Sequence, residues 1–252
     1  MSDALKLDGH QLGAGQPNLL RGGVWVAPSD DASHATFDLE ALGGRYLTRV
    51  FNQGEHVFRP GDAADGFYLV LSGRLKLTLP DPVRGERLVA VCGEGDLFGT
   101  AACGGAPMHR AEAVSLQAGT LVASLSCAEL QEAAKDAPGV ALLLVRALAA
   151  RVQVLEEEAE FASLPAQARL ARTLLDLSRR LGREVMPGVY DLELALRQDE
   201  IASLAGATRV SATQALSAWR NMGMVMGTRG AYRVDAARLE ALLGLLEDAA
   251  VR

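Results

Sequence analysis

The side chains of this 252-residue chain that are best placed to do chemistry gather in one short segment, residues 200–222. Arginine, hydroxyl and amide groups recur there at helical spacing, and such groups pair with base edges and phosphates in a DNA groove. The candidate contact residues are Thr208, Arg209, Val210, Ser211, Thr213 and Gln214. The apolar residues between them have the spacing of a buried helix face: Ala212, Ala215, Leu216 and Trp219. The pattern predicts a helix, capped by Thr208, with one packed face and one polar face.

A second short helix is predicted immediately before this one. Ile201 and Leu204 mark its apolar face, and Gly206 stands where a sharp turn between helices needs a residue that tolerates positive φ. Two helices joined in this way predict a helix-turn-helix whose second helix enters a major groove. An ordinary pair of packed helices has the same pattern, so this segment alone leaves both interpretations open.

The residues that follow predict a basic β-hairpin and a closing helix. The run from Met224 to Val234 has glycines on both sides of Arg229, which is typical of a turn at 227–230. A basic hairpin after a helix-turn-helix is a wing, and Arg229 would contact phosphates; an exposed turn without a partner is the alternative. Leucines at helical spacing over 235–248 predict an amphipathic helix.

Net charge gives no general argument for nucleic acid, because the whole chain carries −6. Locally the balance reverses: 197–233 holds five arginines against two acidic residues. The three cysteines, 92, 103 and 127, contain no CxxC pair and predict neither a metal clip nor a disulfide framework. A secretory leader pattern is not apparent, and the apolar run 140–145 is too short to span a bilayer. We therefore expect a protein of the reducing cytoplasm.

The first half of the chain has a different character. Over 37–133, short β-like runs alternate with glycine turns, which predicts an antiparallel β-roll or barrel. The predicted class is α+β, with four parts. These are a loosely ordered extension (1–36), the β-roll (37–136), a long helix (137–164) and a winged helix-turn-helix domain (165–252).

The long helix is predicted from its heptad pattern, which opens at Pro138-Gly139. Apolar residues recur at alternating steps of four and three, as in a coiled-coil seam. The seam residues are Ala141, Val145, Leu148, Val152, Leu155, Ala159 and Ala162. We expect a parallel homodimer along this seam; a helix packed on its own domain is the alternative.

A family resemblance covers about 37–234. The order G-E-x-V-F-x-x-G-D-x-x-D-G-F-Y-x-V-x-S-G-R-L-K-L from Gly54 to Leu77, with G-D-L-F-G at 95–99, resembles the cyclic-nucleotide-binding roll of the CRP/FNR superfamily of bacterial transcription regulators. The resemblance implies a DNA-binding homodimer that reads an inverted repeat, with RNA polymerase as a further partner. These residues do not decide between activator and repressor.

The resemblance also places an effector pocket at Gly99, Thr100, Ala101, Arg110, Ala111, Leu155 and Glu156. In the cyclic-AMP receptors an arginine and a hydroxyl hold the phosphate, a glutamate binds the ribose, and a Thr-Ser pair contacts adenine. Here Arg110 is retained, but Thr100, Ala111, Leu155 and Glu156 replace the other groups, and Glu112 follows as a carboxylate that would repel phosphate. We expect no cofactor and no dependence on cyclic AMP; cyclic AMP or another small ligand is the alternative.

Other sensor types fit less well. The iron–sulfur branch uses cysteines near the N-terminus, and none precedes Cys92. Cys103 and His109 share the pocket loop, where a haem ligand or a redox thiol would sit, without a defined spacing. No metal site is predicted.

For DNA, the resemblance assigns guanine reading to Arg209 and phosphate contacts to Thr208 and Ser211. Val210 and Gln214 stand where many members carry Glu and Arg, so the half-site should differ from the TGTGA type. Arg197 stands in place of a threonine cap, which predicts a less well defined start of the first helix.

Two rival functions are open to test. A cupin-type enzyme needs clustered histidines, but the four histidines, 10, 34, 56 and 109, are unpaired, so no catalytic residues are predicted. A sensor that acts through protein partners alone is the second rival.

Overall fold

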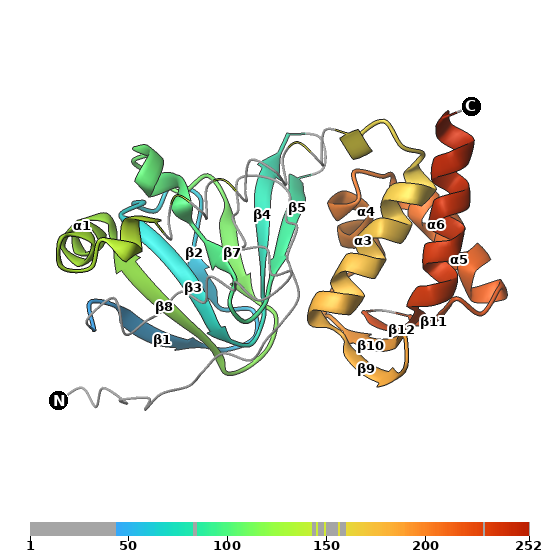
Figure 1. Ribbon diagram of the computed structural model, residues 1–252, viewed down its shortest axis with the longest axis horizontal. Coiled ribbons are helices and arrows are strands. Elements are labelled where there is room, and N and C mark those ends of the chain that lie inside the picture. The colour runs from blue at the N-terminus through green and yellow to red at the C-terminus, as the bar shows by residue number, and fades with distance from the viewer. Residues whose placement is uncertain are drawn as a thin grey trace.

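The chain folds into an N-terminal β-roll and a C-terminal body of helices with a small sheet, as the computed structural model shows (Figure 1). The structure describes residues 44–82, 85–142, 145, 149, 156, 160–228 and 230–251. The expected extension, 1–36, lies outside the described residues. The α+β class and the β-roll are both confirmed.

The roll consists of two four-stranded antiparallel sheets, with orders β1-β8-β3-β6 and β2-β7-β4-β5. The bounds are β1 Leu47–Phe51, β2 His56–Phe58, β3 Gly66–Ser72, β4 Leu75–Asp81, β5 Gly85–Cys92, β6 Leu97–Phe98, β7 Glu112–Ser115 and β8 Thr120–Ser126. Leu75 and Leu77 are fully buried on β4, as the alternation on that strand predicts. Gly73, at φ +90°, makes the β3–β4 turn, and a Cβ there would lie 2.7 Å from Thr120 Oγ1.

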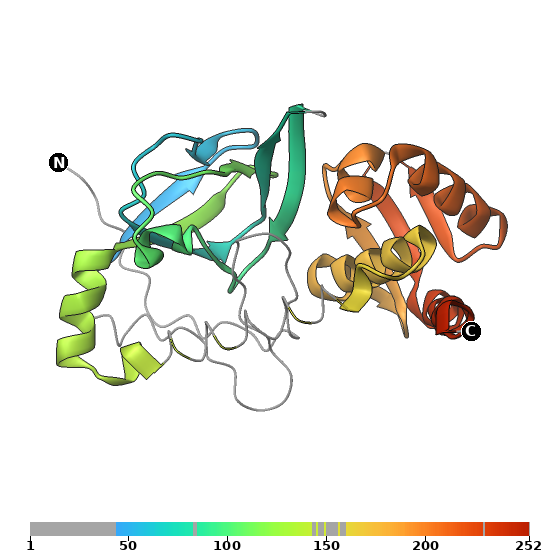
Figure 2. The same ribbon diagram turned by 90° about the horizontal axis from the view of Figure 1, so that it is seen from above.

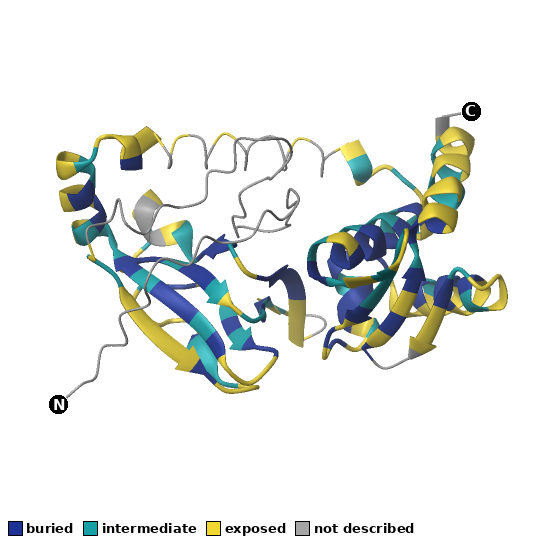
Figure 3. Cartoon of the chain, turned by 60° about the horizontal axis from the view of Figure 1, so that its bottom comes forward, coloured by how far each residue is buried: buried dark blue, intermediate teal, exposed yellow. Residues whose placement is uncertain are grey.

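Two elements of the roll were not predicted from the sequence. Strand β1 pairs with β8 and exposes most of its residues, so it lacks a clear apolar face (Figure 3). Helix α1 (Cys127–Asp136) begins at Ser126, whose hydroxyl accepts from the Glu129 amide at 3.2 Å. The Glu129 carboxylate accepts in return from the Ser126 amide at 2.8 Å, which completes a capping box.

The predicted long helix is described only in part. Residues 139–142, 145, 149, 156 and 160–161 are helical. The seam residues Leu148, Val152, Leu155 and Ala159 lie outside the described residues. Ala162 was expected on the helix but lies in the turn that follows Phe161. The reason is Pro165 downstream: the Leu164 amide bonds to the Phe161 carbonyl at 3.0 Å, and the chain leaves the helix before the proline.

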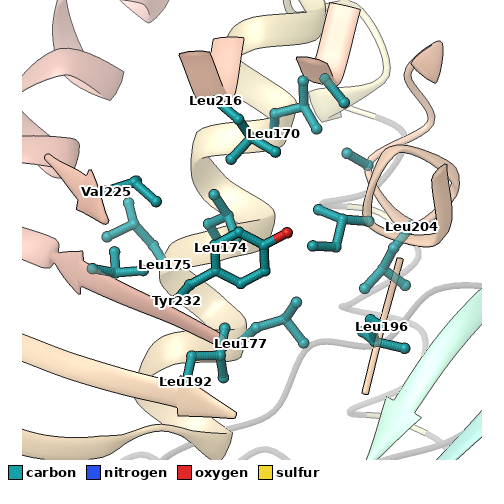
Figure 4. Packing of buried hydrophobic residues seen from close by; sticks show 14 of the residues in the cluster. Leu170, Leu174, Leu175, Leu177, Leu192, Leu196, Leu204, Leu216, Val225 and Tyr232 are labelled. Atoms are coloured by element: carbon teal, nitrogen blue, oxygen red, sulfur yellow. The ribbon is translucent and has the colours of Figure 1, made fainter. Parts of the chain in front are cut away.

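The C-terminal body packs its helices over a four-stranded sheet of order β11-β12-β10-β9. The bounds are α3 Ala166–Leu181, β9 Arg183–Met186, β10 Val189–Glu193, α4 Gln198–Leu204, α5 Arg209–Asn221, β11 Val225–Thr228, β12 Ala231–Asp235 and α6 Ala236–Val251. Leu170, Leu174 and Leu177 line the buried side of α3 and pack with Leu216 and Tyr232 (Figure 4). The β9–β10 hairpin was not predicted. Over the described residues, no helix is both long and apolar enough to cross a membrane.

Candidate nucleic-acid interface

A tight turn joins α4 to α5 and sets the position of the exposed helix. Gly206 has φ +60°, the conformation for which the sequence predicted a glycine. The Ala207 amide bonds back to the Ala202 carbonyl at 2.8 Å. Ile201 and Leu204 are buried, 2% and 5% exposed, so both apolar residues of α4 face the core as expected.

Helix α5 begins at Thr208, which caps it. The Thr208 hydroxyl accepts from the Ser211 amide at 3.1 Å and lies 2.9 Å from the Ser211 hydroxyl. The two hydroxyls assigned to phosphate contacts therefore lie together at the N-terminal end of the helix. Because the first amides of a helix point outward there, this end favours an anion.

The two faces of α5 separate as the sequence predicted. Ala212, Ala215, Leu216 and Trp219 are at most 2% exposed. On the other side Arg209, Val210, Thr213 and Gln214 are exposed, and Val210 is 66% exposed (Figure 3). The Thr213 hydroxyl is not fully available for a partner, because it donates to the Arg209 carbonyl at 2.8 Å.

The wing follows α5 directly and is tied to it. Arg220, in the last turn of α5, donates from Nε to the Gly227 carbonyl at 2.9 Å. Thr228 pairs with Ala231, so the turn is shorter than the expected 227–230, and Gly227 belongs to strand β11. A Cβ on Gly227 would lie 2.2 Å from the Ala231 carbonyl oxygen, which explains the glycine. The wing arginine, Arg229, lies outside the described residues.

The local positive charge is carried by fewer arginines than the sequence count suggests. Arg233 donates from Nε and Nη2 to the two carboxylate oxygens of Asp191, at 2.6 and 2.9 Å. Arg197 lies 3.3 Å from Asp199. Within the described part of the chain, no ion pair engages Arg209. Its guanidinium is therefore free to meet phosphate or a base edge.

The start of α4 is better defined than the sequence suggested. Arg197 takes the cap position without a hydroxyl. Its backbone amide instead donates to Glu200 Oε2 at 2.8 Å, so the glutamate supplies the cap. The expectation of a poorly defined helix start was therefore wrong.

The expected effector-pocket residues lie on two segments of the roll. Gly99, at φ +73°, precedes the short 3₁₀ helix η2 (Thr100–Gly104), which contains Thr100 and Ala101. Arg110 is exposed and Ala111 packs partly against the core just before β7. Glu156 is exposed on the long helix, and Leu155 lies outside the described residues.

An aromatic cluster brings these two segments together. His109 stacks on Phe58 with ring centroids 3.8 Å apart, and Tyr68 stacks on Phe98 at 5.2 Å. A Cβ on Gly99 would lie 2.6 Å from the Tyr68 ring, so Tyr68 covers the start of η2. Burial lowers the pKa of His109, although Asp65 and Asp62 oppose the shift. The sequence predicts a loop position for His109 and contains no local signal of this packing.

Glu112 contacts side chains of the two strands beside it. Its carboxylate contacts His56 Nδ1 at 2.8 Å and accepts from the Thr78 hydroxyl at 3.2 Å. These contacts are between neighbouring strands of one sheet.

Comparisons with known proteins agree with this arrangement. Residues 48–136 match the cyclic nucleotide-binding domain family, and residues 168–243 match the Crp-like helix-turn-helix domain family. The chain is 31% identical to the cyclic AMP receptor protein of Thermus thermophilus over 199 residues, which cover 78% of this chain and 88% of the relative. The chain belongs to the CRP/FNR superfamily of bacterial transcription regulators. Members of this family regulate transcription through DNA rather than catalyse reactions, and the helix-turn-helix is its DNA-binding domain.

Other relatives span a similar share of the chain. The CRP-like cAMP-activated global transcriptional regulator of Mycobacterium tuberculosis is 28% identical over 176 residues, covering 69% of this chain and 78% of the relative. The solved structure of the c-di-GMP-responsive regulator CLP of Xanthomonas campestris has a TM-score of 0.65 at 23% identity, with 78% and 97% of the two chains covered. FixK2 of Bradyrhizobium japonicum has a TM-score of 0.63 at 24% identity, with 78% and 96% covered. These two structures show the shared fold.

Proposed function

We propose that this CRP-like regulator acts as a homodimer that binds an inverted repeat and does not require cyclic AMP. The observation that carries the proposal is the exposed start of α5. There an arginine without an ion pair among the described residues, Arg209, stands beside the cap formed by Thr208 and Ser211. The arginine would read guanine, and the cap would receive a phosphate.

The base preference follows from the neighbours of Arg209. Val210 is apolar and largely exposed, which suits a thymine methyl group, and it cannot accept from a cytosine amino group. Gln214 is exposed one turn later on the same helix face and suits adenine or a phosphate. We propose a half-site that differs from the TGTGA type for this reason. The wing Arg229 would add a phosphate contact.

The dimer is proposed from the apolar residues of the long helix. Val145, a residue of the predicted seam, is 60% exposed in the single chain. Leu142, which lies on the same helix outside the seam, is 53% exposed. An apolar helix face of this kind gains free energy when a second copy covers it. A two-fold pair would present two α5 helices about 34 Å apart, which is one turn of DNA.

Independence of cyclic AMP is supported by the chemistry around Gly99. Tyr68 covers the start of η2, and Ala111 and Thr100 replace the hydroxyl and the carboxylate that a ribose phosphate needs. A buried polar atom of the nucleotide without its partner costs about 1–3 kcal/mol, and several such losses lower affinity by orders of magnitude. The alternative is gating by a small ligand, since relatives are named as cAMP-activated and c-di-GMP-responsive.

Selection of DNA from a random pool, with and without cyclic AMP, tests the proposal. We expect the same inverted repeat in both pools. Enrichment only with cyclic AMP would support the gated alternative, and no enrichment would favour a sensor that acts through protein partners. Sedimentation of the protein alone should give the mass of two chains. In the cytoplasm, RNA polymerase would be the further partner.

A further inference from the structure

The C-terminal body is docked on its own β-roll through a buried ion pair between Arg180 and Asp96. Their side chains are 1% and 3% exposed, and Arg180 Nη2 lies 3.2 Å from Asp96 Oδ2. The same guanidinium donates to the Val91 carbonyl at 3.1 Å and contacts Asp176 of its own helix at 2.8 Å. Burial opposes its charge, but Asp176 and Asp96 outweigh burial and raise the pKa of Arg180. Arg180 therefore keeps its charge inside the interface.

The turn that carries Asp96 fits the end of α3 closely. A Cβ on Gly93 would lie 2.5 Å from Leu181 Cδ2, so a larger residue would displace the end of that side chain. The Gly93 amide donates to Asp96 Oδ2 at 2.8 Å, which fixes the carboxylate that faces Arg180. Asp96 is followed at once by β6 and Gly99. Only the two residues of β6 therefore separate Asp96, which makes the docking contact, from Gly99 of the effector-pocket segment.

A second ion pair holds α4 beside the roll. Lys76 Nζ on β4 lies 2.6 Å from Glu200 Oε1 on α4, with side chains 21% and 9% exposed. The Ser203 hydroxyl donates to the Leu88 carbonyl at 3.3 Å. Figure 2 shows the β4–β5 hairpin next to this helix. Because the pair is largely removed from water, its attraction is weakly screened by salt.

The docked position brings the hairpin to the start of the DNA-contacting helix. A cleft of about 570 Å³ has Gly85 and Glu86 of β5 on one side and Thr208 and Arg209 on the other. A DNA strand that placed a phosphate on the Thr208 cap would bring its negative charge toward the Glu86 carboxylate. Like charges repel, and the repulsion grows where protein walls exclude water.

We infer that this docking is autoinhibitory: the ion pairs Arg180–Asp96 and Lys76–Glu200 hold the roll hairpin across a cleft from the start of α5 and weaken DNA binding. The inference rests on the proposed DNA-binding function. DNA binds the undocked arrangement, so every contact that holds the docked one lowers the apparent affinity.

Asp96→Asn and Lys76→Gln test the inference, because each removes one charge of an ion pair with little change in shape. Binding to the selected DNA site should become tighter by about fivefold or more in each variant. The control is Glu132→Gln, which removes the carboxylate of the exposed Lys135 pair on α1 and should leave affinity unchanged. Glu86→Gln should also tighten binding, since it removes the charge beside α5.

Unchanged or weaker binding by folded Asp96→Asn protein would overturn the inference. If that variant does not fold, the affinity of Lys76→Gln for DNA tests the inference instead. This substitution removes a partly exposed ion pair and does not change Arg180 or Asp96. Small-angle X-ray scattering without DNA gives an independent measurement: the radius of gyration should rise in both interface variants and not in Glu132→Gln. If the radius of gyration of the variants rises but the protein binds no DNA, the docking contacts are supported and the proposed DNA-binding function is wrong. If the variants bind DNA as the wild type does and their radius of gyration does not rise, the docking inference is wrong.

Discussion

Arg169 holds the turn of the helix-turn-helix by donating to the Gly206 carbonyl from Nη2 at 2.8 Å. Its Nε donates to the Ala205 carbonyl at 3.0 Å, and Nη1 donates to the Leu164 carbonyl. One guanidinium on α3 thus satisfies the carbonyls at the end of α4 and the carbonyl that precedes α3. Because those carbonyls lie at chain reversals, they have no partner in a continuing helix.

Arg169→Gln should destabilise the C-terminal body by about 2 kcal/mol, because it removes charge-assisted hydrogen bonds to backbone carbonyls. Denaturant unfolding followed by the fluorescence of buried Trp219 measures the change. Arg179→Gln on the same helix is the matched control. Its exposed pair with Glu240 should contribute less than about 1 kcal/mol. Equal losses in the two variants would contradict the bracing role of Arg169.

Gly206→Ala should cost about 1 kcal/mol, because φ +60° forces an alanine into the left-handed region. Gly244→Ala is the comparison, since a Cβ in that part of α6 has nothing within 4 Å. That change should raise stability by about 0.5–1 kcal/mol through helix propensity. The same fluorescence transition reports both. A neutral Gly206→Ala would mean that the turn relaxes without strain.

Arg209→Ala should weaken binding to the selected site by about 1–3 kcal/mol and leave binding to random DNA nearly intact. The side chain is exposed, so the fold should not change. Fluorescence anisotropy on matched and scrambled duplexes measures both affinities. Arg183→Ala removes an arginine that is 79% exposed on β9 and should change neither. An equal loss on both duplexes would remove the base-reading role of Arg209.

Arg229→Ala should weaken binding to every duplex alike and reduce the salt dependence by about one released counterion. The prediction rests on the sequence position of Arg229, between Gly227 of β11 and Gly230 of the wing. Binding measured from low to high salt gives the slope. A loss confined to one sequence would argue that Arg229 reads bases instead.

The parts of the fold that could be predicted are those that depend on residues close together in the sequence. The buried face of α5, the cap at Thr208 and the glycine turn at Gly206 each depend on spacing within one or two helical turns. Strand β4 alternates because one side of it is buried. Strand β1 was missed because Leu47 and Val50 are 73% and 60% exposed, so burial leaves no pattern in its sequence.

Contacts between distant segments could not be predicted in the same way. Arg180 follows Arg179 near the end of an amphipathic helix, and nothing local distinguishes the buried arginine from the exposed one. Asp96 stands between a glycine and a leucine, 84 residues before its partner. Only the docking of two bodies brings them together. The aromatic packing of His109 has the same origin, because Phe58, Tyr68 and Phe98 come from three different strands.

That packing gives His109 a pH-dependent role in stability. The ring stacks on Phe58, and its buried Nε2 has no hydrogen-bond partner among the residues that the structure describes. Because burial lowers its pKa in the folded state below the ordinary value of 6.5, the unfolded chain binds the proton more readily. The contribution to stability is complete above about pH 6.5 and is lost as the pH falls through the lowered pKa.

His109→Phe should flatten this pH dependence while keeping the stack. The free energy of unfolding of the roll, measured between pH 5 and pH 7.5, should fall with acid in the wild type and much less in the variant. His56→Gln is the control, since that imidazole is partly exposed and contacts Glu112 instead. If His109→Phe lost stability with acid as steeply as the wild type, the titrating group would have to be sought elsewhere. If His109→Phe and the wild type have the same free energy of unfolding at pH 7.5, the buried Nε2 makes no net contribution to the stability of the roll at that pH.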